Sequence, residues 1–318
     1  MSVNIIFISV GFIVYFVSSF FASFEIDPFY RLYYIFAWYS YIFIVDGIIY
    51  SIKRNSLIIS RTSEFFYMLF VSFGWWFLFE IFNIFLKNWS YVMLPYDNSL
   101  RYFGYIFSYA TVLPAIFETS ELIETIGIFK KIKTKNFKTN PIKFDNIIWA
   151  GILSTLFVLI IPKYLFPFIW FFPLLITEPL NLKLGTRSLI REISGGNMEK
   201  VLNISLAGLI CGLLWEFWNF KSGAKWVYHL PFLNEPKLFE MPVYGYIGFI
   251  FFALECYSFY NLLSYFKKGI SWEEDTQTPI FKETKKYFYP IIILSVILIS
   301  IFSINLIDKF TVKTFTAF

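Results

Sequence analysis

Residues 65–86 read FFYMLFVSFGWWFLFEIFNIFL and contain a single charged side chain, Glu80. A run of this length with so little charge is long enough to cross the hydrocarbon core of a bilayer as one helix. An acid inside such a helix costs about 2.5–3.5 kcal/mol on insertion scales, so we expect its carboxyl group to have a structural or chemical role. The stretch therefore predicts a membrane-spanning helix that carries a buried acid.

The rest of the chain has the same character. Of its 318 residues, 58% are hydrophobic, 24% aromatic and 15% charged, whereas a soluble domain carries about 25% charged residues. This composition excludes a disordered or disulfide-stapled chain and indicates an all-α, polytopic integral membrane protein. One His and two Cys residues are too few for haem, iron–sulfur or zinc sites. We expect no cofactor and no such metal, while a hard cation held by carboxylates stays open.

About nine apolar windows of spanning length follow one another along the chain. They cover residues 4–23, 32–51, 65–86, 102–128, 146–162, 164–182, 203–220, 242–265 and 287–307. The first has no charged segment before it, and we interpret it as a retained span rather than a cleaved signal. About two-thirds of the 27 Lys and Arg residues fall on one predicted side, which includes the basic segment 130–145. By the positive-inside rule we expect a plasma or inner membrane protein with a cytoplasmic N-terminus and an external C-terminus.

The sequence also contains two similar halves. Residues that match at a nearly constant offset are Trp38 with Trp170, Asp46 with Glu178, Ser56-Leu57-Ile58 with Ser188-Leu189-Ile190, Glu80 with Glu216, Asn83 with Asn219, Trp89 with Trp226, Tyr91 with Tyr228, and Glu118 with Glu255. We predict a first four-helix repeat over 1–129, a basic cytoplasmic linker over 130–145, a second four-helix repeat over 146–265, and a cytoplasmic loop with the ninth helix over 266–318. Repeats with an even number of spans insert in the same direction, so a pseudo-twofold axis along the membrane normal relates them. A site shared by both repeats should lie near that axis.

The matched residues give three pairs of acids in or near the spans. Glu80 and Asn83 are three residues apart and share a helix face, and the same holds in the second repeat. In one interpretation the amide orients the carboxylate, and the carboxyl groups shuttle protons or hold a cation. In the other, Glu–Asn pairs lock helices together through hydrogen bonds worth about 0.6–2 kcal/mol. The recurrence of three pairs favours the functional interpretation.

The other polar and aromatic residues allow simpler explanations. Asp46 and Glu178 fall near the cytoplasmic ends of their spans, where they could pair with Lys53 or Lys183. The aromatic residues that follow the third and seventh spans are typical of a membrane-interface belt. His229 is also expected to be an interface residue.

The order Glu-x-x-Asn, Trp-x-Tyr, Gly and then a span bearing Glu occurs over 80–118 and again over 216–255. This order resembles the membrane lycopene-cyclase and carotenoid-hydratase families. The resemblance implies a small multi-span protein, built of tandem repeats, whose intramembrane acids protonate or hydrate polyene double bonds without a redox cofactor. The chain departs from those cyclases in one motif. They carry a Pro-x-Glu-Glu type sequence, whereas this chain has the single acids Glu118 and Glu255.

We therefore expect an intramembrane acid–base enzyme of the cyclase, isomerase or hydratase type, acting on an apolar lipid or isoprenoid. Glu118 and Glu255 would donate protons, while Glu80 and Glu216 would orient the substrate or stabilise a developing cation. The expected substrate-binding residues are Asn83, Asn219, Trp89, Tyr91, Trp226 and Tyr228. The expected partners are membrane lipids and an apolar small molecule, and no nucleic acid. Two alternatives stay open: a transporter or channel for a proton, cation or small solute, and a structural membrane subunit.

Overall fold

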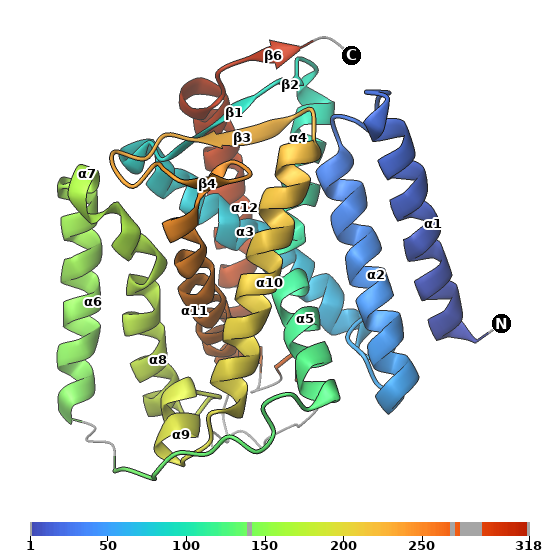
Figure 1. Ribbon diagram of the computed structural model, residues 1–318. Helices are drawn as coiled ribbons and strands as arrows, with labels where there is room; N and C mark the ends of the chain where they lie inside the picture. Colours follow the sequence, from blue (N-terminus) through green and yellow to red (C-terminus); the bar gives the residue numbers. More distant parts are fainter. Residues whose placement is uncertain (1, 139–141, 268–270, 274–287, 317–318) are drawn as a thin grey trace. The chain divides into compact units, whose positions relative to one another are not determined.

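The structure is a computed structural model that describes residues 2–138, 142–267, 271–273 and 288–316 (Figure 1). It is mostly helical. The helices are α1 (Val3–Ser23), α2 (Tyr33–Lys53), α3 (Thr62–Leu86), α4 (Asn98–Ala110), α5 (Val112–Ile126), α6 (Ile142–Ile160), α7 (Pro162–Leu165), α8 (Phe172–Leu184), α9 (Leu189–Ser194), α10 (Glu199–Lys221), α11 (Tyr246–Ser264) and α12 (Phe288–Leu306). The described residues also form short strands, which the sequence did not lead us to expect. They are β1 (Trp89–Val92), β2 (Leu94–Pro95), β3 (Lys225–Tyr228), β4 (Lys237–Leu238), β5 (Met241–Pro242) and β6 (Phe315–Thr316).

Eight helices in the described part of the chain are long and apolar enough to cross a membrane, which is the architecture of an integral membrane protein. They are Val3–Ser23, Tyr33–Lys53, Thr62–Leu86, Asn98–Ile126, Pro162–Leu184, Glu199–Lys221, Val243–Lys267 and Pro290–Thr311. These match eight of the predicted windows. The remaining window, 146–162, coincides with a shorter apolar helix, Phe144–Ile160. The ninth span therefore stays a prediction.

Some predicted features lie outside the described residues. They are positions 139–141 of the linker, the first residue of the last predicted window, and four of the Lys residues used for the orientation: Lys268, Lys282, Lys285 and Lys286.

The span Asn98–Ile126 is interrupted at Thr111, between α4 and α5. Pro114 explains the break, because a proline has no N–H to donate to the carbonyl four residues earlier and its ring clashes with that carbonyl. Ser72 of α3 fills the gap in the hydrogen bonding. Its Oγ donates to the carbonyl of Tyr109 at 2.7 Å and accepts from the N–H of Leu113 at 3.0 Å. The break thus fixes Tyr109 against α3.

Prolines also shape the span Pro162–Leu184. Pro162 begins α7, Pro167 lies in a 3-10 turn over Phe166–Trp170, and Pro173 lies in the first turn of α8. These are positions where the missing N–H has no helical partner to lose. Pro179 lies inside α8, where it removes one backbone hydrogen bond.

The chain divides into two compact units. Unit 1 consists of Met1–Thr119, Cys211–Tyr246 and Ser295–Phe318, and unit 2 of Ser120–Ile210 and Ile247–Leu294. In unit 1, α1 and α2 approach closely at two glycines. A Cβ on Gly11 would lie 2.8 Å from the Ser40 carbonyl oxygen, and one on Gly47 would lie 2.9 Å from the Asn4 carbonyl oxygen. Small residues at such contacts let membrane helices pack at short range.

Beyond the ends of its helices, the described residues of unit 1 form three small two-stranded sheets, β1–β3, β2–β6 and β4–β5. Strands β1 and β3 run antiparallel and side by side (Figure 1), with Trp89 opposite Tyr228 and Tyr91 opposite Trp226. Strand β6, near the C-terminus, pairs in parallel with β2. The turn after α12 is fixed to α4 by Arg101, whose Nε and Nη2 donate to the carboxylate of Asp308 at 3.0 and 2.6 Å. This bidentate geometry is the strong form of a charge-assisted hydrogen bond.

In unit 2, helices α10 and α11 approach closely at Gly208 of α10. A Cβ there would lie 2.4 Å from the carbonyl oxygen of Phe249 and 2.6 Å from the Cβ of Ala253, both on α11. Helices α6 and α8 also meet at a glycine, Gly151, whose Cβ would lie 2.9 Å from Ile176.

Candidate functional site

Glu80 lies near the end of α3 and is only 1% exposed. One of its carboxyl oxygens, Oε1, accepts hydrogen bonds from Trp76 Nε1 at 3.0 Å, Trp89 Nε1 at 3.1 Å and the Tyr91 hydroxyl at 2.5 Å. The Tyr109 hydroxyl donates to the Tyr91 hydroxyl at 2.8 Å and also lies 3.4 Å from Oε1. The other oxygen, Oε2, is buried and has no hydrogen-bond partner among the residues that the structure describes. All the donors therefore converge on a single oxygen.

Glu216 of α10 has a related but sparser environment. It is fully buried, and its Oε1 accepts from the Tyr228 hydroxyl at 2.7 Å. The Trp226 indole donates in turn to the Tyr228 oxygen at 2.9 Å. As with Glu80, Oε2 is buried without a hydrogen-bond partner in the described chain.

The β1–β3 sheet carries hydrogen-bond donors to both of these carboxyl groups. Trp89 and Tyr91 are two residues apart, so their side chains lie on the same face of β1, and the same holds for Trp226 and Tyr228 of β3. Residues directly opposite each other in an antiparallel pair also share a face, and Trp89 is opposite Tyr228. One face of this sheet therefore supplies donors to acids from two different helices. The other face carries Ser90, whose Oγ lies 2.6 Å from Nε2 of His229.

The phenols of this sheet remain hydrogen-bond donors at any ordinary pH. Burial, together with the nearby charge of Glu80, raises the pKa of Tyr91 well above its usual value. Burial and Glu216 do the same for the pKa of Tyr228. Both hydroxyl groups consequently keep their protons.

Asn83 and Asn219 do not contact the neighbouring carboxyl groups as we expected. The Asn83 side chain donates to the Trp89 carbonyl at 2.9 Å and accepts from the Trp89 N–H at 3.2 Å. Asn219 makes the same two bonds, both 2.9 Å, to the backbone of Trp226. Each amide therefore holds the backbone of a strand residue, Trp89 of β1 or Trp226 of β3, and it positions the indole rather than the acid. The reason is that α3 and α10 each end within a few residues of a strand, whose unpaired backbone groups are the nearest partners.

Two residues around Glu80 were missed by sequence reasoning. Trp76 precedes Glu80 by one helical turn, a spacing that places two side chains together. Gly212 takes the corresponding position before Glu216. Matching the two halves therefore gives no signal for Trp76. Tyr109 comes near Glu80 because of the break at Thr111, which the position of Pro114 alone could have suggested.

Asp46 and Glu178 have matching local roles, one in each unit. Asp46 accepts from the Ser56 hydroxyl at 2.9 Å and from the Ile58 N–H at 2.6 Å. Glu178 accepts from the Ser188 hydroxyl at 2.8 Å and from the Ile190 N–H at 3.1 Å. Each acid therefore fixes the turn that follows its helix. Lys183, which we considered as a partner for Glu178, pairs with Asp145 instead.

The acids that we expected to donate protons fall in different units. Glu118 is fully buried in unit 1, where its side chain interacts with that of Asp46. Glu255 is fully buried in unit 2 on α11, and neither of its oxygens has a hydrogen-bond partner in the described residues. Their proposed role as proton donors stays a prediction.

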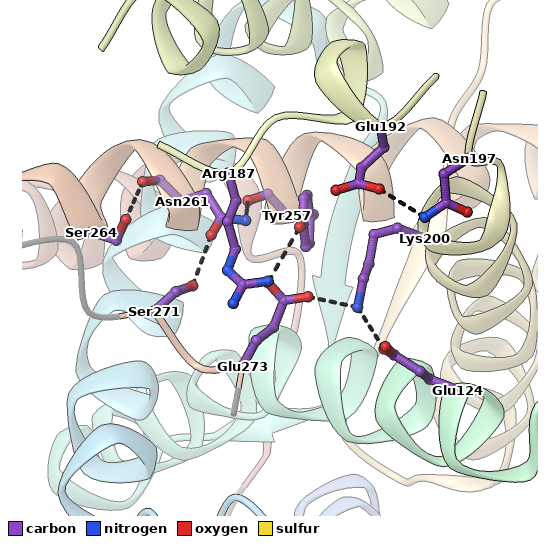
Figure 2. A network of polar contacts seen from close by, with 10 residues as sticks. All are labelled: Glu124, Arg187, Glu192, Asn197, Lys200, Tyr257, Asn261, Ser264, Ser271 and Glu273. Atoms are coloured by element: carbon purple, nitrogen blue, oxygen red, sulfur yellow. Dashed lines mark hydrogen bonds and ion pairs between the residues drawn. The ribbon is translucent and has the colours of Figure 1, made fainter. Parts of the chain in front are cut away.

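Unit 2 contains a separate charged network, which Figure 2 shows. Glu273 pairs with Arg187 at 2.8 Å and with Lys200 at 2.6 Å, and Lys200 also pairs with Glu124 at 2.5 Å. Beside Glu273, the Ser271 hydroxyl donates to Asn261 Oδ1 at 2.7 Å. Burial would raise the pKa of Glu273, but the positive charges of Lys200 and Arg187 outweigh it and hold the pKa below its usual value. The network thus fixes the segment Ser271–Glu273 through ion pairs.

The described residues contain no group of three or more His, Cys, Asp or Glu side chains placed to hold a metal ion. Oε2 of Glu80 and Oε2 of Glu216 are both buried without a hydrogen-bond partner in the described residues, as are both carboxyl oxygens of Glu255. Glu80 and Glu216 differ from Glu255 because donors from the β1–β3 sheet hold their Oε1 atoms.

In comparisons with protein-family models, with curated proteins and with solved structures, nothing matches this chain.

Proposed function

We propose that this protein is an intramembrane acid–base enzyme that acts on an apolar lipid or isoprenoid, and that Glu80 and Glu216 supply the chemistry. The observation that carries the proposal is the one-sided hydrogen bonding of both acids. Donors from α3 and from the β1–β3 sheet occupy Oε1, while Oε2 of each acid is buried without a partner among the described residues. A carbon–carbon double bond is a group that can accept a proton from such an oxygen without itself needing a hydrogen-bonding site.

The aromatic side chains around the acids support this choice of substrate. The Trp76 and Trp89 rings are 6.2 Å apart beside Glu80, and Tyr34 packs edge-on against Trp226 at 5.2 Å on the Glu216 side. Protonation of a double bond creates a carbocation, and aromatic faces attract cations. The proposed reaction class is a proton-initiated isomerisation, cyclisation or hydration. In this proposal Glu80 and Glu216 carry the acid–base role, while the role of Glu118 and Glu255 as proton donors stays a prediction.

We further propose that the chain consists of two like-oriented four-helix repeats followed by a ninth helix, with the N-terminus in the cytoplasm. The pairing of β1 with β3 supports this layout. These strands follow α3 and α10, which are equivalent in the two repeats, and repeats inserted in the same direction place such segments on the same side of the membrane. The Asp46–Ser56–Ile58 contacts and their counterparts at Glu178 support it as well, because they reproduce one local structure twice.

The test compares lipid extracts of cells that express the wild-type protein, Glu80→Gln, Glu216→Gln, or no protein. We expect a lipid change with the wild type that both variants abolish, because glutamine keeps an accepting oxygen but neither gives nor takes the proton of a carboxyl group. Asp145→Asn is the control, since it removes an exposed carboxylate outside the site and should leave the change intact. In cells grown in D2O the product should gain deuterium from solvent.

An unchanged lipid profile in Glu80→Gln and Glu216→Gln would overturn the enzyme proposal. Proton or cation flux through liposomes containing the purified protein, lost on neutralising Glu80 or Glu216, would instead favour the transporter. If extracts and liposomes both show no effect, the structural-subunit hypothesis gains support.

A further inference from the structure

The two carboxyl groups below the β1–β3 sheet have unlike surroundings. Glu80 Oε1 accepts three direct hydrogen bonds, from Trp76, Trp89 and Tyr91. Glu216 Oε1 accepts a hydrogen bond from Tyr228, and the Trp226 indole, which donates to the Tyr228 oxygen, also interacts with Glu216. The difference has a cause in the sequence, because the residue one turn before Glu80 is a tryptophan and the residue one turn before Glu216 is Gly212.

Hydrogen bonds to a carboxyl group favour its charged form when several donors point at it. Bonds to an ionised acceptor are also about twice as strong as neutral ones. Three donors on one oxygen, with a fourth hydroxyl behind them, are therefore suited to a carboxylate. The Glu80 environment has this pattern.

The Glu216 environment has the opposite pattern. With fewer donors than Glu80, less compensates for the cost of burying a negative charge at Glu216. A neutral carboxylic acid therefore suits this position better than it suits the position of Glu80.

Resting on the proposed function, we infer that the two acids divide the work: Glu216 is the general acid that protonates the substrate, and Glu80 is the carboxylate that stabilises the resulting cation and removes a proton from it. This deepens the proposed function by assigning each carboxyl group a role. Opposite roles for two carboxyl groups are set by environment in other acid–base sites as well.

The step balances without a co-reactant. The O–H bond of Glu216 Oε2 breaks, its proton forms a new C–H bond with the π electrons of a substrate double bond, and Glu216 becomes a carboxylate. Glu80 Oε2 then takes a proton from a carbon beside the cation, and the electrons of that C–H bond form a new double bond. One proton must return from Glu80 to Glu216 before the next turnover.

The test needs no substrate. Infrared difference spectra of the purified full-length protein in detergent compare the wild type with Glu216→Gln and with Glu80→Gln at neutral pH. We expect Glu216→Gln to remove the C=O stretch of one protonated carboxyl group, and Glu80→Gln to remove the stretch of one carboxylate. The reverse assignment, or loss of the same kind of band in both variants, would overturn the division.

Two milder variants keep the test usable if a glutamine variant does not fold. Tyr228→Phe removes the direct donor to Glu216 and should shift the protonated C=O band, whereas Tyr91→Phe should leave that band in place and shift a carboxylate band. A shift of the protonated band by Tyr91→Phe would contradict the assignment. The spectra are independent of turnover. Unchanged lipid profiles together with the expected spectra would refute the proposed enzyme activity. Loss of turnover together with the opposite spectra would refute only the division of roles between Glu216 and Glu80.

Discussion

Tyr91 and Trp226 face each other across the β1–β3 sheet, yet they belong to the surroundings of different acids. Tyr91 donates directly to Glu80, whereas Trp226 donates to Tyr228, which donates to Glu216. A pair of strands that is only four residues long therefore links the two carboxyl groups of the candidate site. Its backbone position is set by Asn83 and Asn219.

The first prediction concerns these two amides. Asn83→Ala leaves the N–H and C=O groups of Trp89 without their partner, and each buried group left unsatisfied costs about 1–3 kcal/mol. We expect a clearly lower melting temperature in detergent, and a similar loss for Asn219→Ala.

Asn305→Ala is the control, because Asn305 is exposed and its amide donates to the Ile301 carbonyl in its own helix. Its effect should stay within about 0.5 kcal/mol. Equal melting temperatures for Asn83→Ala and Asn305→Ala would show that the amides do not anchor the strands.

The second prediction concerns helix packing in unit 2. Gly208→Ala would place a Cβ 2.4 Å from the Phe249 carbonyl oxygen, which forces α10 and α11 apart, so we expect a loss of stability. Gly104→Ala is the matched variant, since nothing lies within 4 Å of its Cβ position. It should stabilise the protein by about 0.5–1 kcal/mol through helix propensity alone. Thermal unfolding of both variants in the same detergent decides, and a stabilised Gly208→Ala would contradict the packing described.

The third prediction concerns the pH dependence of the segment Ser271–Glu273. The pKa of Glu273 in the folded protein is held below its usual value by Lys200 and Arg187 despite burial. Its ion pairs therefore stabilise the protein above the ordinary glutamate pKa of about 4.3, and this contribution is lost as the pH falls through the lowered folded value.

Trp272 reports on this segment, because it is 1% exposed and lies 5.8 Å from the Lys200 ammonium group. The fluorescence difference between the wild type and Trp272→Phe should be constant from neutral pH to about pH 5 and change as the acid form is reached. Glu273→Gln should alter it already at neutral pH and flatten the profile. A profile that is unchanged in Glu273→Gln would exclude this carboxylate as the cause.

The fourth prediction concerns orientation. Cys211 and Cys256 are buried, so a membrane-impermeant maleimide should leave the wild type unlabelled. In intact cells we expect Tyr96→Cys to be labelled, because Tyr96 is 76% exposed and follows β2 on the proposed outer side. Lys135→Cys should be labelled only after the membrane is opened. The opposite pattern would reverse the proposed topology.

Sequence hydrophobicity and the matched residues predicted part of the fold and of the candidate site. Apolar windows located eight helices of spanning length because hydrophobicity and length are local properties of the chain. The match between Glu80 and Glu216 also suggested a shared site. The strands were not foreseen, because residues 89–92 and 225–228 are too short to show alternation and their pairing joins distant parts of the chain.

The hydrogen bonds around the acids were the least predictable feature. Helix-face arguments relate Asn83 only to neighbours on α3, so they pointed to Glu80, whereas its actual partners lie beyond the end of the helix. Tyr91 and Trp226 were assigned in part to a membrane belt because sequence cannot tell whether a polar tip points to water or to a buried carboxyl group.

The β1–β3 pairing has a consequence for a protein supplied in two pieces. A chain cut after Lys135 would leave β1 on one fragment and β3 on the other, so that neither fragment alone could form the β1–β3 sheet. Co-expressed fragments should associate through the pairing of β1 with β3, and their reassembly can be followed by split-reporter complementation.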